Sequence, residues 1–189
     1  KTLAVTSTSP EEGKTVVASN LAVVLAQAGR RVLIIDADMR RPKVHEVFDV
    51  PQQPGLPGAL VHARDSIAEF IRRDSVSGLE ILAAGSTPPN PAELLAMPAF
   101  RELLDRLSPS YDHIIIDCPP IMAVTDASLV ANEVSGVVFV IGADATTRAA
   151  ARTALDELRD SRDNVVGAVL NRVDLRRNSY YYARYYRPE

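Results

Sequence analysis

Cysteine is nearly absent from this sequence, since Cys118 is the only one among 189 residues. A single thiol excludes a disulfide framework and a cysteine-based zinc site, and the three histidines show no spacing typical of metal ligands. Long hydrophobic runs are also missing, because the apolar stretch at 136–143 is far shorter than the roughly 18 residues that a membrane-spanning helix requires. This composition excludes a disulfide-stapled or membrane-spanning chain and is typical of a reducing cytoplasm.

The apolar residues that are present suffice for one domain. Hydrophobic residues make up 47% of the chain and charged residues 24%, which allows a sizeable buried core. No internal repeat and no linker divides the body of the chain. The sequence begins at Lys1 with neither a methionine nor a signal peptide, so we expect it to be part of a longer protein.

Charge and tyrosine are distributed unevenly at the C-terminal end. The net charge is −3, but residues 176–189 contain four arginines against one glutamate, so the preceding residues carry −6. Five of the six tyrosines fall within the last ten residues, and only Tyr111 lies elsewhere. We therefore predict two parts, a folded catalytic body over 1–175 and a flexible tyrosine-rich tail over 176–189.

Short β-branched runs alternate with helical patterns along the body. Helices are predicted at 15–29, with Gly29 as C-terminal cap, and at 146–161, while 51–58 and 83–93 are predicted loops around one or two further helices. The alternation predicts an α/β fold with a doubly wound, mainly parallel sheet and ligand sites at the carboxyl ends of its strands. We expect strands, covered on both faces, at residues 3–6, 32–36, 79–84, 113–117, 136–141 and 165–170.

The first strand leads into STSPEEGKT at 7–15 and then into a helix, which is the setting of a phosphate-binding loop. Gly13, Lys14 and Thr15 match the end of the GxxxxGK[ST] pattern, whereas Thr8 replaces its first glycine. In such loops backbone N–H groups surround the phosphates, the lysine contacts the β and γ oxygens, and the threonine ligates Mg²⁺. The alternative, an ordinary capped helix start, leaves GKT after a strand unexplained. The predicted nucleotide-binding residues are Thr8, Ser9, Pro10, Glu11, Glu12, Gly13, Lys14, Thr15 and Val16.

Acidic residues follow two further predicted strands. Asp36 and Asp38 come at the end of the second strand, Arg40 is close behind, and Asp117 ends the strand at 113–117. Carboxylates at this edge of a sheet hold hydrated Mg²⁺ or accept a proton, and a guanidinium matches phosphoryl oxygens. A surface turn could use one such acid, but the combination beside a phosphate loop favours metal and phosphate chemistry. The predicted metal site comprises Thr15, Asp36 and Asp117.

These motifs resemble the Walker A, A′ and B motifs of the bacterial tyrosine kinases, the autokinases associated with polysaccharide co-polymerases. The matching segments are TSTSPEEGKT, VLIIDADMRRP and HIIIDCPP, followed by VTDAS at 124–128. GSTPPNPAELL at 85–95 and GAVLNRVD at 167–174 are similar to further family signatures, so the resemblance covers essentially the whole chain. It implies a P-loop NTPase fold of three α/β/α layers that binds ATP and Mg²⁺. It also implies adenine contacts at Asn171 and Arg172, for which a plain strand end is the alternative.

The resemblance also implies a role for each catalytic residue. Lys14 holds the phosphates, Thr15 and Asp117 position Mg²⁺, and Arg40 acts beside them. Either Asp36 or Asp38 accepts the tyrosine proton, because a phenol with a pKa of about 10 is a weak nucleophile near neutral pH. The implied phosphorylated residues, on the tail of a neighbouring copy, are Tyr180, Tyr181, Tyr182, Tyr185 and Tyr186.

Partners and location are likewise implied by the family. We expect autophosphorylation between copies and, in the full-length protein, a ring assembled through an upstream ExxRxxR helix that this chain begins too late to contain. The implied activator is a transmembrane polysaccharide co-polymerase at the cytoplasmic face of the bacterial inner membrane, and the implied outcome is regulation of exopolysaccharide or capsule synthesis and export. Polysaccharide-precursor enzymes are possible further substrates. Nucleic acid is not an expected partner, because the −6 body repels a polyanion.

Two alternatives to the kinase stay open at this point. A partition or cell-division type of ATPase switch (MinD/ParA-like) has a similar loop, but it carries a signature lysine early in the loop that Thr8, Ser9 and Pro10 do not supply. A nucleotide-binding module without turnover is the other. For the kinase, we expect the basic tail to be drawn towards a site that holds ATP and the acids at 36, 38 and 117, and to be repelled once it is phosphorylated.

Overall fold

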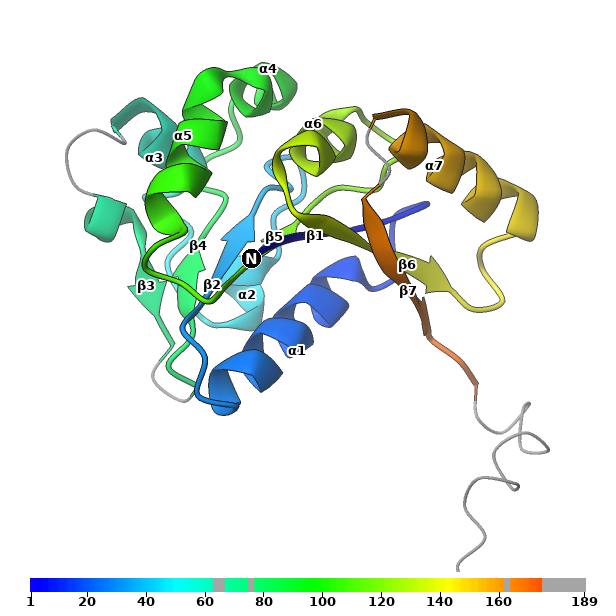
Figure 1. The fold of residues 1–189 in the computed structure, drawn as a ribbon, viewed down its shortest axis with the longest axis horizontal. Helices are drawn as coiled ribbons and strands as arrows, with labels where there is room; N and C mark the ends of the chain where they lie inside the picture. The colour runs from blue at the N-terminus through cyan, green and yellow to red at the C-terminus, as the bar shows by residue number, and fades with distance from the viewer. Residues whose placement is uncertain (63–66, 75–76, 162–163, 175–189) are drawn as a thin grey trace, which may run out of the picture.

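The computed structural model describes residues 1–62, 67–74, 77–161 and 164–174. These residues form one seven-stranded sheet in the order β3-β4-β2-β5-β1-β6-β7, in which β3 alone pairs antiparallel with its neighbour (Figure 1). The strands are β1 (Thr2–Ser7), β2 (Val32–Asp36), β3 (Arg72–Arg73), β4 (Glu80–Leu82), β5 (His113–Asp117), β6 (Gly136–Gly142) and β7 (Val165–Asn171). The helices are α1 (Lys14–Gln27), α2 (Val44–Val47), α3 (Leu56–His62), the 3₁₀ helix η1 (Ile67–Phe70), α4 (Pro91–Ala96), α5 (Pro98–Leu107), α6 (Asp126–Glu133) and α7 (Arg148–Ser161).

Helices cover the sheet in two layers, which confirms the predicted α/β/α fold (Figure 1). Helices α1 and α2 pack on one face, where Ala18 and Ala22 of α1 meet the apolar side chains of β1 and β2. Helices α3 to α7 pack on the other face, around Phe100 and Phe139. Strand β2 is buried along its whole length because both faces are covered, as its continuous apolar sequence predicts.

The strand order brings three distant loops together. β5 lies between β1 and β2, so Asp36 at the end of β2 stands in register with Asp117 at the end of β5, and Asp117 in turn with Val5 of β1. The phosphate loop leaves β1 at this same edge. Parallel pairing therefore gathers the three predicted motifs at one carboxyl edge of the sheet.

Several predicted boundaries are wrong. The predicted loops at 51–58 and 83–93 overlap two helices, because α3 begins at Leu56 and α4 at Pro91. Proline suits this first-turn position, where its missing N–H costs no hydrogen bond. The two-residue edge strand β3 was not predicted, since two arginines carry no strand pattern. The cap at Gly29 is confirmed, because this residue has φ 78° and its N–H donates to Ala26 O.

Strand β7 corrects the expectation that every strand is covered on both faces. Val166 is 62% exposed and Leu170 is 61% exposed, although both lie in an apolar run. β7 is the last strand of the sheet and pairs only with β6 in the described part of the chain. In that part, no helix is long and apolar enough to cross a membrane.

Candidate nucleotide site

The phosphate loop joins β1 to α1 in a shape that two residues with positive φ make possible. Glu11 has φ 66° and Gly13 has φ 88°. A side chain at Gly13 would also collide with Asn171, whose Nδ2 would lie 2.1 Å from the added Cβ. Because α1 begins at Lys14, its first N–H groups have no partner within the helix and form an anion site at the loop.

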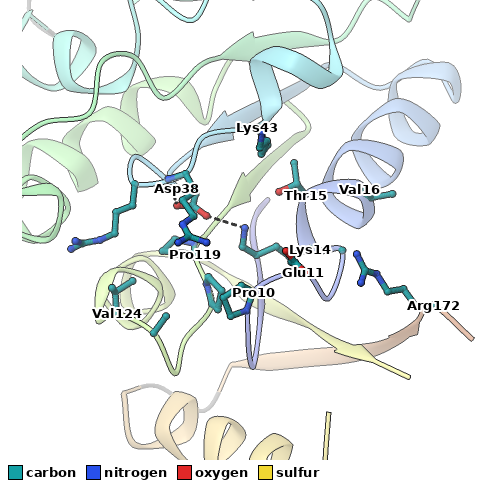
Figure 2. Close-up of a pocket in the computed structure, with 15 residues that line it drawn as sticks. Pro10, Glu11, Lys14, Thr15, Val16, Asp38, Lys43, Pro119, Val124 and Arg172 are labelled. Atoms are coloured by element: carbon teal, nitrogen blue, oxygen red, sulfur yellow. Dashed lines mark hydrogen bonds and ion pairs between the residues drawn. The ribbon is translucent and has the colours of Figure 1, made fainter. Parts of the chain in front are cut away.

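A cavity of about 450 Å³ opens beside this loop (Figure 2). Most of the predicted site residues line it, together with cations and apolar residues that the sequence did not single out. Predicted residues on the lining are Pro10, Glu11, Gly13, Lys14, Thr15, Val16, Asp38, Arg40 and Arg172. Additional residues on the lining are Arg41, Lys43, Pro119, Pro120, Ala123 and Val124. Predicted residues outside the lining are Thr8, Ser9, Glu12, Asp36, Asp117 and Asn171.

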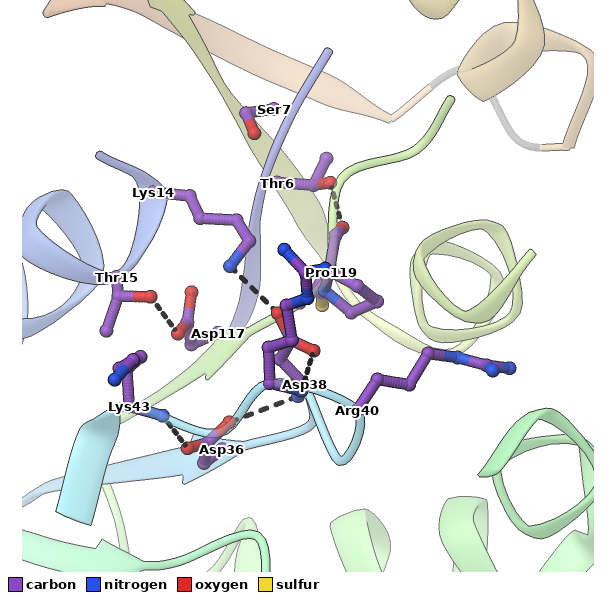
Figure 3. A network of polar contacts seen from close by, with 12 residues as sticks. Thr6, Ser7, Lys14, Thr15, Asp36, Asp38, Arg40, Lys43, Asp117 and Pro119 are labelled. Atoms are coloured by element: carbon purple, nitrogen blue, oxygen red, sulfur yellow. Dashed lines mark hydrogen bonds and ion pairs between the residues drawn. The ribbon is translucent and has the colours of Figure 1, made fainter. Parts of the chain in front are cut away.

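Two polar contacts connect the phosphate loop to the acids (Figure 3). Lys14 Nζ lies 2.9 Å from Asp38 Oδ2, and the Thr15 hydroxyl donates to Asp117 Oδ2 at 2.6 Å. Burial alone lowers the pKa of Lys14, but the charges of Asp117 and Asp38 outweigh it, so the net pKa is raised. Lys14 is therefore charged and centred among the acids. We call Lys14, Thr15, Asp36 and Asp117 the cavity floor.

Asp36 lies beneath the cavity. It has no exposed surface, and its two oxygens accept backbone N–H bonds from Asp38, Lys43 and Val44, each at 3.1 Å. Burial raises the pKa of Asp36 to about 8, and the nearby charge of Asp117 adds to the effect. The side chain thus shapes the loop after β2, and of the two candidate bases Asp38 is the one on the cavity lining.

One carboxylate oxygen of Asp117 is free to bind a cation. In the described part of the chain its Oδ1 is buried and has no hydrogen-bond partner, while Oδ2 accepts from Thr15. Burial raises the pKa of this carboxyl, and Lys14 and the Thr15 hydroxyl oppose the rise. No group of three or more His, Cys, Asp or Glu there could hold a metal by itself. The residues nevertheless fit Mg²⁺, which is held by one or two protein oxygens together with phosphates and water.

Glu12 belongs to the phosphate loop but its side chain is buried away from the cavity. The carboxylate accepts from the backbone N–H of Ser9 at 2.7 Å, from that of Gly142 at 3.2 Å, and from the Thr146 hydroxyl. Asn171 Nδ2 donates to the Glu12 carbonyl at 2.9 Å. Glu12 therefore ties the loop to the end of β6 and to β7, whereas the Ser-x-x-Glu spacing could have suggested only its contact with the Ser9 N–H.

Arg40 makes an ion pair that the sequence analysis missed. Its Nε and Nη2 donate to the two oxygens of Asp126 at 2.9 and 3.0 Å. Asp126, the first residue of α6, is completely buried, whereas the Arg40 side chain is 41% exposed. Arg40 consequently extends away from Lys14 (Figure 3). The only signal for Asp126 was its place in the VTDAS segment.

Asn171 and Cys118 both have structural roles. The amide of Asn171 is used by the phosphate loop, and the adjacent Arg172, with φ 60°, lines the cavity. Cys118 is fully buried, and burial, followed by the charge of Asp117, raises the pKa of its thiol. Its position in the apolar core is that of a packing residue. The predicted tail tyrosines lie outside the described residues.

The fold and the site define a P-loop nucleotide-binding domain whose lysine, threonine and acids converge on one cavity. Residues 1–151 match the family described as AAA domain. The chain is 39% identical over 181 residues to the tyrosine-protein kinase YwqD of Bacillus subtilis, covering 96% of this chain and 76% of YwqD.

Solved structures agree with this likeness. The kinase domain of the Escherichia coli tyrosine kinase ETK superposes with a TM-score of 0.86 at 36% identity, over 90% of this chain and 66% of that one. The VpsO kinase domain superposes with a TM-score of 0.86 at 37% identity, over 92% of this chain and 85% of that one. The chain therefore belongs to the bacterial tyrosine-protein kinase family, and its enzyme class is protein-tyrosine kinase. The ATPase-switch alternative is not favoured.

Proposed function

We propose that residues 1–175 form a catalytic domain that binds ATP with Mg²⁺ and transfers the γ-phosphate to tyrosines in the 176–189 tail of another copy. The observation that carries the proposal is the convergence of Lys14, Thr15, Asp38 and Asp117 beside one cavity. Loop amides and Lys14 suit the phosphates, and Arg172 lies at the opposite end of the cavity from Val124 (Figure 2), where it suits the nucleoside.

The residues of the cavity floor fit a bound Mg²⁺. Thr15 Oγ1 and the vacant Asp117 Oδ1 would hold the ion, directly or through water. When bound, Mg²⁺ neutralises charge on the phosphates. Asp36 fits this role less well, because its oxygens are already used by backbone N–H groups.

Asp38 is the proposed general base. It lies on the cavity lining, and Lys14 has three N–H donors, so it can keep one on Asp38 while directing others to phosphate oxygens. In the transfer step the bond between the γ-phosphorus and the β,γ-bridging oxygen breaks and a bond from phosphorus to the phenolic oxygen forms. The phenolic proton passes to the Asp38 carboxylate, and ADP leaves.

Mixing two variants tests transfer between copies. One chain carries Lys14→Met and keeps its tail, and the other keeps Lys14 and has phenylalanine at all five tail tyrosines. Neither can phosphorylate itself, so phosphotyrosine on the Lys14→Met chain, measured by intact mass and blotting, is the expected result. An unlabelled Lys14→Met chain, together with a parent whose rate per chain is independent of concentration, would contradict transfer between copies. ADP formation without phosphotyrosine in any mixture would contradict kinase activity.

The wider setting is proposed from family resemblance alone. It comprises homo-oligomeric assembly of the full-length protein, a transmembrane polysaccharide co-polymerase as activator, and the cytoplasmic face of the bacterial inner membrane. Regulation of exopolysaccharide or capsule synthesis and export is the proposed outcome. Phosphotransfer measured with and without a co-polymerase segment is the test, and a rate unchanged by every such segment would count against the activator.

A further inference from the structure

The cavity carries more positive charge than negative charge. Five cations line it, namely Lys14, Arg40, Arg41, Lys43 and Arg172, against the two acids Glu11 and Asp38. Asp36 and Asp117 lie behind this lining and have no exposed area. The expectation that the basic tail is drawn in concerns a site that holds ATP and stays a prediction, and the residues of the lining alone do not supply that attraction. A basic tail meets a cationic entrance instead.

The segment after β2 presents three of these cations, Arg40, Arg41 and Lys43, which we call the rim. Its backbone is held from below by the two aspartates of the same segment. The N–H of Arg41 donates to Asp38 Oδ1 at 3.0 Å, and that of Lys43 donates to Asp36 Oδ2 at 3.1 Å. The rim side chains are thus exposed, but the backbone that carries them is held in place. A backbone that is already ordered lowers the entropy cost of binding a ligand.

Two rim cations are available to an anion. Arg40 is occupied by the buried carboxylate of Asp126. Lys43 contacts Glu46, but their side chains are 58% and 54% exposed, and such surface pairs exchange readily for a stronger partner. Arg41 is exposed and makes no ion pair within the described part of the chain.

The proposed acceptor side of the cavity lies opposite its nucleoside end. Val16 and Arg172 lie on one side of Lys14, and Pro119 and Val124 lie on the other (Figure 2). The first side is the proposed nucleoside end, so the acceptor tyrosine approaches from the second. Its apolar wall of Pro119, Pro120 and Val124 suits an aromatic ring, and the rim follows directly after Asp38, the proposed base.

We propose that Arg41 and Lys43 form an anion subsite that binds the phosphate of a phosphotyrosine adjacent to the acceptor tyrosine in the tail of another copy. This proposal rests on the proposed function. A phosphotyrosine carries about −1.5 to −2 charges, and the guanidinium of Arg41 and the ammonium of Lys43, both on the cavity lining, are groups that bind phosphate oxygens. Tyr180, Tyr181 and Tyr182 are consecutive, so the first phosphate made there becomes a neighbour of the next acceptor.

The consequence is that each transfer favours the next one on the same tail. The first phosphorylation is the slow step, because an unmodified tail carries four arginines and faces the cationic rim. Later ones gain the contact with Arg41 and Lys43. This reverses the expectation that phosphorylation limits itself through charge repulsion.

Single-acceptor peptides test the subsite. Each spans residues 178–187, keeps Tyr181 as the acceptor and has phenylalanine at the other tyrosines. Primed versions carry phosphotyrosine at position 180 or 182. The kinase is the chain with phenylalanine at all five tail tyrosines, so that its own tail does not compete. We expect a KM about five- to tenfold lower for at least one primed peptide than for the unprimed one, with the advantage falling as salt rises.

The double variant Arg41→Gln, Lys43→Gln should bring the ratio of the two KM values close to one. Arg152→Gln, an exposed arginine on α7 away from the cavity, is the matched control and should keep the parent ratio. Fluorescence anisotropy of labelled primed and unprimed peptides gives the same comparison without turnover if the double variant is inactive. Equal or higher KM for both primed peptides, or a ratio unaffected by the double variant, overturns the subsite. Absence of phosphorylation of every peptide by the parent would instead count against the proposed function.

Discussion

The floor and the rim of the cavity both carry charged side chains, but these side chains are held in opposite ways. The floor residues Asp36 and Asp117 are completely buried, where Asp36 accepts three backbone N–H bonds and Asp117 accepts from the Thr15 hydroxyl. At the rim, Lys43 is 58% exposed and its ion pair lies in solvent. A buried charge lowers the stability of the folded chain unless it is paired or hydrogen-bonded, whereas replacing an exposed charge changes the stability little. Changes at the floor should therefore abolish function or folding, and changes at the rim should adjust it.

Lys14→Met should have the largest effect. It removes the ammonium group between Asp38 and Asp117 that is aimed at the phosphates. We expect ATP binding to weaken strongly and phosphotransfer to fall by a factor of about 100 or more, as for other lost groups that stabilise a charged transition state. Nucleotide titration and a phosphotyrosine blot measure this. Undiminished phosphotyrosine in this variant would place the active site elsewhere.

Asp38→Asn and Asp36→Asn should separate chemistry from structure. Asp38→Asn should lower phosphotransfer about 100-fold or more through loss of the base, in a chain that still folds although Lys14 loses its ion-pair partner. Asp36→Asn turns an acceptor oxygen into a donor that faces backbone N–H groups, which should lower the free energy of unfolding by about 1–3 kcal/mol. Urea denaturation and single-turnover rates measure the two effects. If both variants transfer phosphate at the parent rate, the base is another residue.

Asp117→Asn should act through the metal. The vacant Oδ1 of the buried carboxylate loses its charge, so the Mg²⁺ concentration for half-maximal activity should rise about tenfold or more. Some nucleotide binding should persist, because Lys14 and the loop amides are unchanged. The comparison is a Mg²⁺ titration of parent and variant at saturating ATP. Identical titration curves would argue against a metal site at Asp117.

Asp126→Asn and Glu46→Gln should give the smallest effects and compare a buried ion-pair partner with an exposed one. Asp126 is buried and makes two hydrogen bonds to Arg40, so its change should lower the melting temperature by about 2–4 °C. Glu46 pairs with Lys43 in solvent, so its change should stay within about 1 °C. Thermal unfolding monitored by circular dichroism gives both values. Equal shifts would contradict the distinction between buried and exposed pairs.

Much of the fold could be predicted because it depends on local pattern. β2 and β5 coincide with the predicted runs at 32–36 and 113–117, since strands buried on both faces are continuously apolar. The edge of the sheet was harder to predict. β3 consists of two arginines, which carry no strand pattern. β7 is apolar yet largely exposed, because exposure at the edge of a sheet depends on what lies beside the strand rather than on the sequence of the strand.

The site shows the same division. The sequence alone predicts the phosphate loop and the acids at the ends of β2 and β5. Binding of phosphate and Mg²⁺ depends on residue types, namely a glycine-containing loop, a lysine and carboxylates, and these are visible in the sequence. Tertiary structure decides which acid faces the cavity. Asp36 and Asp38 are two residues apart on one segment, yet one anchors backbone N–H groups and the other reaches Lys14. That choice, like the Arg40–Asp126 pair and the cationic rim, depends on burial and on partners contributed by distant strands and helices, which no local pattern contains.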